Sequence, residues 1–147
     1  MSIATDVVDA QIEAYRTKDV ERFLACYAED ASVVLFDGTP MFADKHVMRE
    51  QYGKLFSDSP DLHLTVANRM IAGEFVVDEE HVSGMHFGDM PTEITALSVY
   101  RVTNGKIASL MLLFLLTPAS ESAERKTAVP CSLREIAKSA RLAWSVG

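Results

Sequence analysis

The dipeptide Asn104-Gly105 joins two long runs of strand-forming residues, Glu93–Thr103 and Lys106–Leu116. Asn-Gly is the strongest short signal for a two-residue β-hairpin, because a type I′ turn needs positive φ at both of its central positions. We therefore expect the two runs to be neighbouring antiparallel strands. The end of the second run, Leu110–Leu116, is apolar at every position, which indicates a strand that is covered on both faces.

The chain before this hairpin divides into helical and strand-like segments. Alternating or β-branched runs predict strands at Ala31–Phe36, Leu62–Ile71 and Phe75–Ser83. Apolar residues with helical spacing predict helices at Asp6–Thr17, Val20–Ala28 and Asp44–Phe56. Helices grouped before a run of antiparallel strands indicate an α+β fold, with the helices packed on one face of a curved sheet.

Composition restricts the function classes. The 147 residues suit one domain, and 48% are hydrophobic, as in ordinary globular proteins. The net charge of −7 argues against a nucleic-acid partner, since binding to phosphates depends on clustered Lys and Arg. The N-terminal residues lack the basic region and apolar run of a signal peptide, and no segment is long enough to span a bilayer. We therefore expect a cytoplasmic protein without a membrane or nucleic-acid partner.

The last part of the sequence differs from the rest. Residues 1–117 form the predicted domain, whereas 118–147 begin with a small, polar linker. Apolar residues recur with helical spacing from Leu133 to Trp144, which predicts a short helix over 132–144. This helix either packs on the domain or its dimer mate, or is frayed.

Two stretches resemble a known family. IEAYRTKDVERFLACYAEDASVVLFDG is similar to the helical hairpin and first strand of the nuclear-transport-factor-2-like superfamily, in its ketosteroid-isomerase and SnoaL-like polyketide-cyclase branch. NRMIAGEFVVDEEHVSG and ITALSVYRVTNGKIASLMLLF resemble later strands of that branch. The resemblance covers Asp6 to Phe114. It implies a cone-shaped fold, with three N-terminal helices on a curved, mostly antiparallel sheet and a pocket for a small, largely apolar molecule. The fold hosts isomerases, cyclases, hydrolases and non-enzymatic domains, so it does not define the activity.

The resemblance also predicts that the usual isomerase groups are missing. The family's general-base aspartate aligns with Leu35, its oxyanion-donating tyrosine with Gln11, and its protonated aspartic acid with Ser98. Leucine cannot transfer a proton, so we do not expect ketosteroid isomerisation by the familiar route. Tyr27 and Tyr52 align with supporting tyrosines. They form either a hydrogen-bonded group with Gln11 or ordinary core packing.

The segment Asp78–His81 is the main candidate for proton transfer. The alignment predicts that Glu79 and His81 face the pocket with Val77 and Ser83, since alternate strand residues share a face. A carboxylate that orients an imidazole is a common general-base arrangement. The opposite alternation would instead place Asp78, Glu80 and Val82 inside, and a solvated acidic segment is a further alternative.

Asp37 and Tyr52 complete the predicted catalytic set. Asp37 lies two residues after Leu35 and would share its inward face closer to the mouth of the pocket. Alternatively, Asp37-Gly38 is ordinary turn chemistry. The residues expected to bind the ligand are Gln11, Tyr15, Tyr27, Leu35, Asn68, Ser98, Tyr100, Leu112 and Phe114.

Neither a metal nor a cofactor is implied. The histidines and cysteines lack the spacing of metal ligands, and the chain has no phosphate-binding glycine loop, dinucleotide fingerprint or nucleophile elbow. We favour a cofactor-free isomerase, cyclase or dehydratase that acts by acid–base chemistry on a small apolar molecule. The alternative is a non-catalytic ligand-binding or dimerisation module. The outward Leu97 and Val99 and the apolar last strand predict a homodimer through the outer face of the sheet.

Overall fold

The structure is a computed structural model that describes residues 2–115. Helix α1 (Ile3–Arg16) begins earlier than the expected Asp6, because Ser2 caps it. The Ser2 side chain accepts a hydrogen bond from the Thr5 N–H at 3.1 Å, and Thr5 Oγ1 accepts one from the Ser2 N–H at 3.3 Å. This reciprocal pair satisfies N–H groups that a helix start leaves unpaired.

Two further helices complete the helical layer. Helix α2 (Val20–Ala25) is capped by Asp19, and α3 (Lys45–Asp58) by Asp44. Helix α2 ends before the expected Ala28, because strand β1 (Tyr27–Leu35) already starts at Tyr27. The ring of Phe23 on α2 lies 4.4 Å from that of Tyr52 on α3 and 5.3 Å from that of Tyr27 on β1, measured between centroids. This aromatic contact joins the helices to one edge of the sheet.

The sheet has five strands in the order β1-β5-β4-β3-β2. The later strands are β2 (His63–Ala72), β3 (Phe75–Ser83), β4 (Ile94–Thr103) and β5 (Lys106–Leu115). Strand β1 runs parallel to β5, and all other pairs are antiparallel. The predicted Asn104-Gly105 hairpin is confirmed, with φ of 55° at Asn104 and 74° at Gly105. The predicted tail over 118–147 lies outside the described residues.

Strand β2 contains an irregularity that changes which side chains face inward. Val66 pairs with Glu80 and Asn68 pairs with Glu79, so Ala67 is an extra residue of a β-bulge. Beyond the bulge the alternation is inverted. Arg69 therefore faces the helices opposite Asp78, and Asn68 faces outward.

The facing of β3 is opposite to the one that we expected. Its buried residues are Val76, Asp78, Glu80 and Val82. Glu79 and His81 consequently lie on the outer face of the sheet. The reason lies in the neighbouring strands, since Arg69 on β2 and polar groups on β4 supply partners for the two buried acids.

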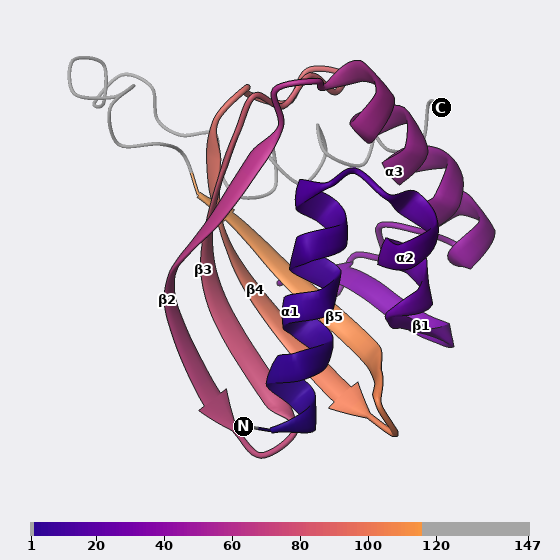
Figure 1. Ribbon diagram of the computed structural model, residues 1–147, viewed down its shortest axis with the longest axis vertical. Coiled ribbons are helices and arrows are strands. Elements are labelled where there is room, and N and C mark those ends of the chain that lie inside the picture. Colours follow the sequence, from indigo (N-terminus) through magenta and orange to yellow (C-terminus); the bar gives the residue numbers. More distant parts are fainter. Residues whose placement is uncertain (1, 116–147) are drawn as a thin grey trace.

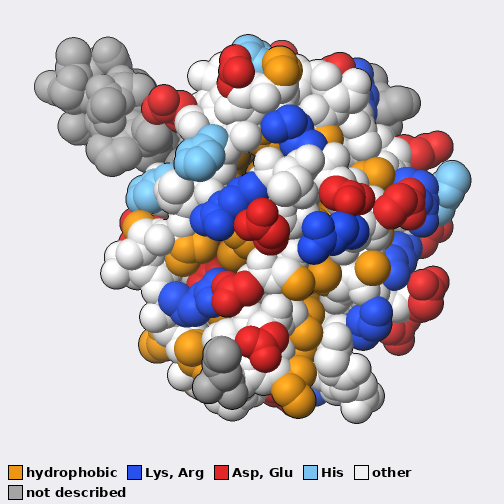
Figure 2. Space-filling view, in the orientation of Figure 1, with side chains coloured by type: hydrophobic (Ala, Val, Ile, Leu, Met, Phe, Trp, Pro, Cys, Tyr) orange, Lys and Arg blue, Asp and Glu red, His pale blue; other side chains and the backbone are white. Residues whose placement is uncertain are grey.

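The helices and the sheet form two layers. Figure 1 shows α1 lying across the sheet, with α2 and α3 beside it, so that the helices cover the concave face. On the surface in Figure 2, Lys and Arg side chains lie among Asp and Glu side chains. Within residues 2–115, every helix is too short or too polar to cross a lipid bilayer.

The outer face of the sheet carries an apolar row across all five strands, formed by Val34, Met111, Val99, Val77 and Met70.

Candidate functional site

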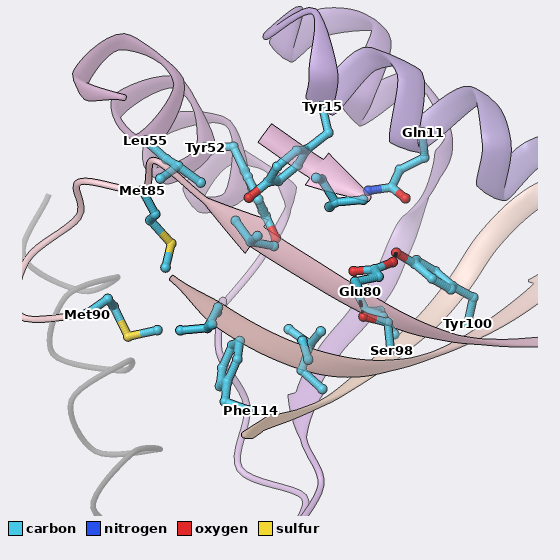
Figure 3. A pocket seen from close by; sticks show the side chains of 16 residues that line it. Gln11, Tyr15, Tyr52, Leu55, Glu80, Met85, Met90, Ser98, Tyr100 and Phe114 are labelled. Carbon is cyan, nitrogen blue, oxygen red and sulfur yellow. Dashed lines mark hydrogen bonds between the residues drawn. The ribbon is translucent and has the colours of Figure 1, made fainter. Parts of the chain in front are cut away.

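A cavity of about 60 Å³ lies between the helices and the concave face of the sheet. Most of its wall is apolar and comes from α3, the β3–β4 loop and the sheet. Figure 3 shows Gln11, Glu80, Ser98 and Tyr100 gathered at one end, and Met85 and Met90 at the other. An apolar chamber with a few convergent polar groups is typical of a site for a small molecule. The cavity is lined by Gln11, Tyr15, Tyr52, Leu55, Leu64, Glu80, Val82, Met85, Met90, Ile94, Ala96, Ser98, Tyr100, Leu110, Leu112 and Phe114.

Glu80 is the acidic group of this cavity. Its carboxyl group is buried, and both of its oxygens accept a hydrogen bond. The Ser98 hydroxyl donates to Oε1 at 2.9 Å, and the Tyr100 hydroxyl donates to Oε2 at 2.8 Å. Both partners lie on β4, which pairs with β3, so the sheet itself holds the three side chains together.

The environment of Glu80 raises its pKa to about 7. Burial is the largest cause, because a buried carboxylate loses its hydration. The hydrogen bonds from Tyr100 and Ser98 lower the pKa, and the nearby Asp78 raises it. At neutral pH both protonation states of Glu80 are therefore populated, which suits a group that takes up and returns a proton.

Asp78 is the second buried acid, and Arg69 holds it. Asp78 is 0% exposed. The Arg69 Nε donates to Asp78 Oδ1 at 2.7 Å, and Nη2 donates to Oδ2 at 2.9 Å. Arg69 also binds Asp9 of α1 at 2.7 Å. This bidentate contact compensates the charge of Asp78. The positive charge of Arg69 also lowers the pKa of Glu80.

Three tyrosines line the cavity together with Glu80. Burial raises the pKa of Tyr15, Tyr52 and Tyr100 well above the ordinary value, and the proximity of Glu80 adds to the rise. Their hydroxyl groups therefore keep their protons at physiological pH and can act as hydrogen-bond donors. Figure 3 shows Tyr15 and Tyr52 reaching into the cavity from α1 and α3.

Gln11, Tyr52 and Tyr27 do not form the hydrogen-bonded group that was one of the two alternatives for them. Among the described residues, Gln11 Oε1 and the Tyr27 hydroxyl have no hydrogen-bond partner. Tyr27 and Leu35 are buried in the core, and neither lines the cavity. The aromatic contacts of Tyr27 thus correspond to the core-packing alternative.

The predicted pair of Glu79 and His81 does come together, but on the outer face. Their side chains are 34% and 49% exposed, and His81 Nε2 lies 3.6 Å from Glu79 Oε2. Asn68 donates to Glu79 Oε1 at 2.8 Å, and His81 Nδ1 lies 2.9 Å from Thr95 Oγ1. The expectation that Glu79, His81 and Asn68 face the cavity is therefore wrong, because of the strand alternation and the bulge at Ala67.

Asp37 also lies outside the cavity. It is exposed, and its Oδ1 accepts a hydrogen bond from the Thr39 N–H at 3.0 Å. The next residue, Gly38, has φ of 90°. This is the geometry of the turn alternative.

The lining does include most of the remaining predicted residues. The cavity brings together Gln11, Tyr15, Tyr52, Ser98, Tyr100, Leu112 and Phe114. The sequence predicts an inward Glu80 only under the opposite alternation of β3. It does not predict the contact of Arg69 with Asp78, since a bulge after Val66 has no signal in the sequence. Within residues 2–115, His, Cys, Asp and Glu side chains form no group that could hold a metal ion.

The sequence matches a known domain family over most of its length. The profile of the SnoaL-like domain matches residues 8–110. The chain belongs to the SnoaL-like domain family. The fold is accordingly α+β, with helices on a curved, open, mixed sheet of the nuclear-transport-factor-2-like type. No curated protein matches the sequence significantly.

Solved structures with this fold are distant in sequence. An NTF2-like protein of unknown function from Cytophaga hutchinsonii is 18% identical, with a TM-score of 0.62 over 76% of this chain and 89% of that one. An LEH-like epoxide hydrolase from M. tuberculosis is 14% identical, with a TM-score of 0.62 over 77% and 83%. A computationally designed 17-OHP binder is 19% identical, with a TM-score of 0.66 over 79% and 94%. At these identities the similarity shows the fold alone.

Proposed function

We propose that this SnoaL-like domain is a cofactor-free enzyme of the isomerase, cyclase or dehydratase type, and that Glu80 transfers the proton. The observation that supports this most is the buried Glu80 carboxyl at the polar end of an apolar cavity, with a pKa of about 7. A general acid or base works best when its pKa lies near the operating pH, and ordinary surface carboxyls are too acidic for this.

The proposed cycle uses groups of this chain only. The carboxylate of Glu80 accepts a proton from a C–H or O–H group of the bound molecule, and the resulting carboxylic acid returns the proton at another atom of that molecule. Ser98 and Tyr100 donate to the two oxygens of the Glu80 carboxyl group, so they fix its position and stabilise its charged form. The apolar wall keeps water away from the reacting atoms.

The proposal also gives the replaced isomerase positions a role. Ser98, which aligns with the family's protonated aspartic acid, donates to a carboxyl group that reaches over from the adjacent strand. A carboxyl group thus lies near that position, although the residue is different. The general-base position, Leu35, contributes to the core instead.

A non-catalytic binding module is the second candidate. It is favoured by the lack of the isomerase groups at Gln11, Leu35 and Ser98 and by the small cavity. One solved neighbour with this fold is described as a binder. A module of this kind would need no proton transfer by Glu80.

The probe 5-nitrobenzisoxazole distinguishes the two candidates. A base removes its only ring C–H proton next to nitrogen, the N–O bond breaks, and a coloured phenolate is released, so no cofactor is required. We expect turnover that rises with pH around 7, as Glu80 ionises, and a loss of about a hundredfold or more in Glu80→Gln.

Glu79→Gln is the matched control, because Glu79 is adjacent in sequence but lies on the outer face. It should leave both the rate and the pH profile unchanged. Equal turnover by the wild type, Glu80→Gln and Glu79→Gln would contradict the assignment of Glu80. A wild-type rate no greater than that in buffer would favour the binding module.

A further inference from the structure

Gln11 occupies an unusual position on α1. The residue is 4% exposed and lies on the buried face of the helix, between the apolar residues Val8 and Tyr15. Among the described residues, its Oε1 has no hydrogen-bond partner. A buried acceptor without a partner destabilises a fold, so natural cores keep few of them. An apolar side chain would complete the stripe of α1 without this cost.

The cavity offers a reason for keeping this glutamine. Gln11 lines it, and Figure 3 shows its side-chain amide pointing toward the polar end, where Glu80 and Tyr100 lie. The neighbouring hydroxyl groups do not donate a hydrogen bond to Gln11 Oε1. The Tyr100 hydroxyl donates to Glu80 Oε2, and the Ser98 hydroxyl donates to Glu80 Oε1. The missing donor has to come from whatever enters the cavity.

The chemistry of the neighbours limits what that donor can be. A ketone or an ether oxygen cannot donate, so it would leave Gln11 Oε1 unsatisfied. A hydroxyl group can donate to Gln11 and still accept a hydrogen bond, and Tyr15 reaches into the cavity as a possible donor. An ammonium group donates but cannot accept.

We propose that the bound molecule is a small apolar alcohol, phenol or enol whose hydroxyl group donates to Gln11 Oε1 at the polar end of the cavity, beside Glu80. The proposal rests on the proposed function in that it takes this cavity as the substrate site. It adds that Gln11 selects hydroxylated molecules over their ethers and parent hydrocarbons. The selectivity has an energetic basis, because a hydroxyl group gives Gln11 Oε1 a hydrogen bond, whereas an ether or a hydrocarbon leaves this buried acceptor unsatisfied.

The test compares phenol with anisole, its methyl ether, which has a similar shape but no donor. Binding is measured by calorimetry or ligand-observed NMR. We expect the wild type to bind phenol roughly tenfold or more tightly than anisole, in line with the cost of an unsatisfied buried group. Gln11→Met keeps the length of the side chain and should bind the two probes about equally.

Gln51→Met is the matched control. Gln51 is also 4% exposed, and its Oε1 also has no partner among the described residues, but it does not line the cavity. It should retain the preference for phenol. The proposal is overturned if the wild type binds both probes equally, binds neither at millimolar concentration, or keeps its preference in Gln11→Met.

Thermal unfolding provides an independent reading of the same variant. Since Met can fill the site without an unsatisfied oxygen, the melting temperature of unliganded Gln11→Met should rise by several degrees. A fall in melting temperature would show that Gln11 is satisfied within the protein and would overturn the proposal.

Glu80→Gln separates the proposal about Gln11 from the proposed function. If this variant loses turnover of 5-nitrobenzisoxazole but still prefers phenol to anisole, both hypotheses are supported. If it keeps both the turnover and the preference for phenol, only the role of Glu80 in proton transfer is refuted.

Discussion

The Tyr100 hydroxyl and the Glu80 carboxyl group meet 2.8 Å apart in the interior, although they lie on different strands. Their strands pair so that Tyr100 lies opposite Val76, and Glu80 lies further along the same face of β3. Contacts of this diagonal kind depend on strand register as much as on residue type. The protonation behaviour of the cavity is therefore a property of the β3–β4 pair.

The first prediction concerns the dependence of stability on pH. The folded-state pKa of Glu80, about 7, exceeds the ordinary value of 4.5, so between these values the folded state binds more protons than the unfolded state. Stability contributed by this group is then fully present below pH 4.5 and is lost as the pH rises through 7. The loss should be on the order of 3 kcal/mol. Denaturant titrations from pH 5 to 8 should show this fall, and Glu80→Gln should flatten it; an equally steep fall in the variant would contradict it.

A second prediction concerns the donors to Glu80. Tyr100→Phe removes the hydrogen bond that most lowers the pKa of Glu80, so this pKa should rise above 7. Ser98→Ala should act in the same direction, but less strongly. NMR of protein with labelled glutamate carboxyl carbons would follow the titration. Tyr15→Phe is the control, since Tyr15 lines the cavity but the donors to Glu80 are Ser98 and Tyr100. An equal rise in Tyr15→Phe would refute the assignment to Tyr100.

The third prediction contrasts two arginine pairs. Arg69→Met leaves the fully buried Asp78 without its bidentate partner and should lower the free energy of unfolding by about 3–5 kcal/mol. Arg101→Met breaks the exposed pair with Glu74 and should cost about 1 kcal/mol or less. Chemical denaturation measures both. Similar losses in the two variants would show that Arg69 does not compensate a buried charge.

The fourth prediction concerns assembly. We propose that the apolar row on the outer face, which includes Val99, Val77 and Met111, forms the contact of a homodimer. Met111 is 40% exposed and Met70, at the end of the row, is 62% exposed, and a contiguous apolar patch of this kind is typical of an interaction surface. Sedimentation at micromolar concentration should show a dimer, and Val99→Asp should convert it to a monomer. Val99→Thr, similar in shape, should weaken it less, and a monomeric wild type would refute the proposal.

A fifth prediction tests the anchoring of the β3–β4 loop, which carries Met85 and Met90 of the cavity. A Cβ atom at Gly84 would lie 2.2 Å from the Asp61 carbonyl oxygen, and Gly84 has φ of +71°. Gly84→Ala should therefore displace the loop and destabilise the fold by several kcal/mol, to be measured by denaturation. Gly73→Ala also has positive φ, but nothing lies within 4 Å of its Cβ position, so it should cost only about 1 kcal/mol. Equal losses would show that the contact with Asp61 is unimportant.

Local signals in the sequence were sufficient for much of the fold. The cap at Asp44, the turn at Asn104-Gly105 and the helical spacing on α1 are each determined by nearby residues. The facing of β3 was not predictable in this way. Its apolar start, Phe75-Val76-Val77, suits either alternation, and its acids occur on both faces.

The polar end of the cavity depends on partners that are distant in sequence. Glu80 can be buried because Ser98 and Tyr100 donate to it, and Asp78 because Arg69 follows an unpredicted bulge. Taken alone, the sequence Asp78-Glu79-Glu80-His81 resembles a solvated strand. Only the register of β2, β3 and β4 shows which of these acids is solvated.

The parallel pairing of β1 with β5 has a consequence for how the chain folds. Tyr27 pairs with Ile107, so the backbone groups of β1 that face β5 are paired only after β5 has formed. Contacts so far apart in sequence slow folding, because a long loop must close before they form. During synthesis, the helices and β1 leave the ribosome well before β5. We therefore expect an early intermediate in which the edge of β1 is unpaired. This intermediate can aggregate until the β4–β5 hairpin forms and covers the edge.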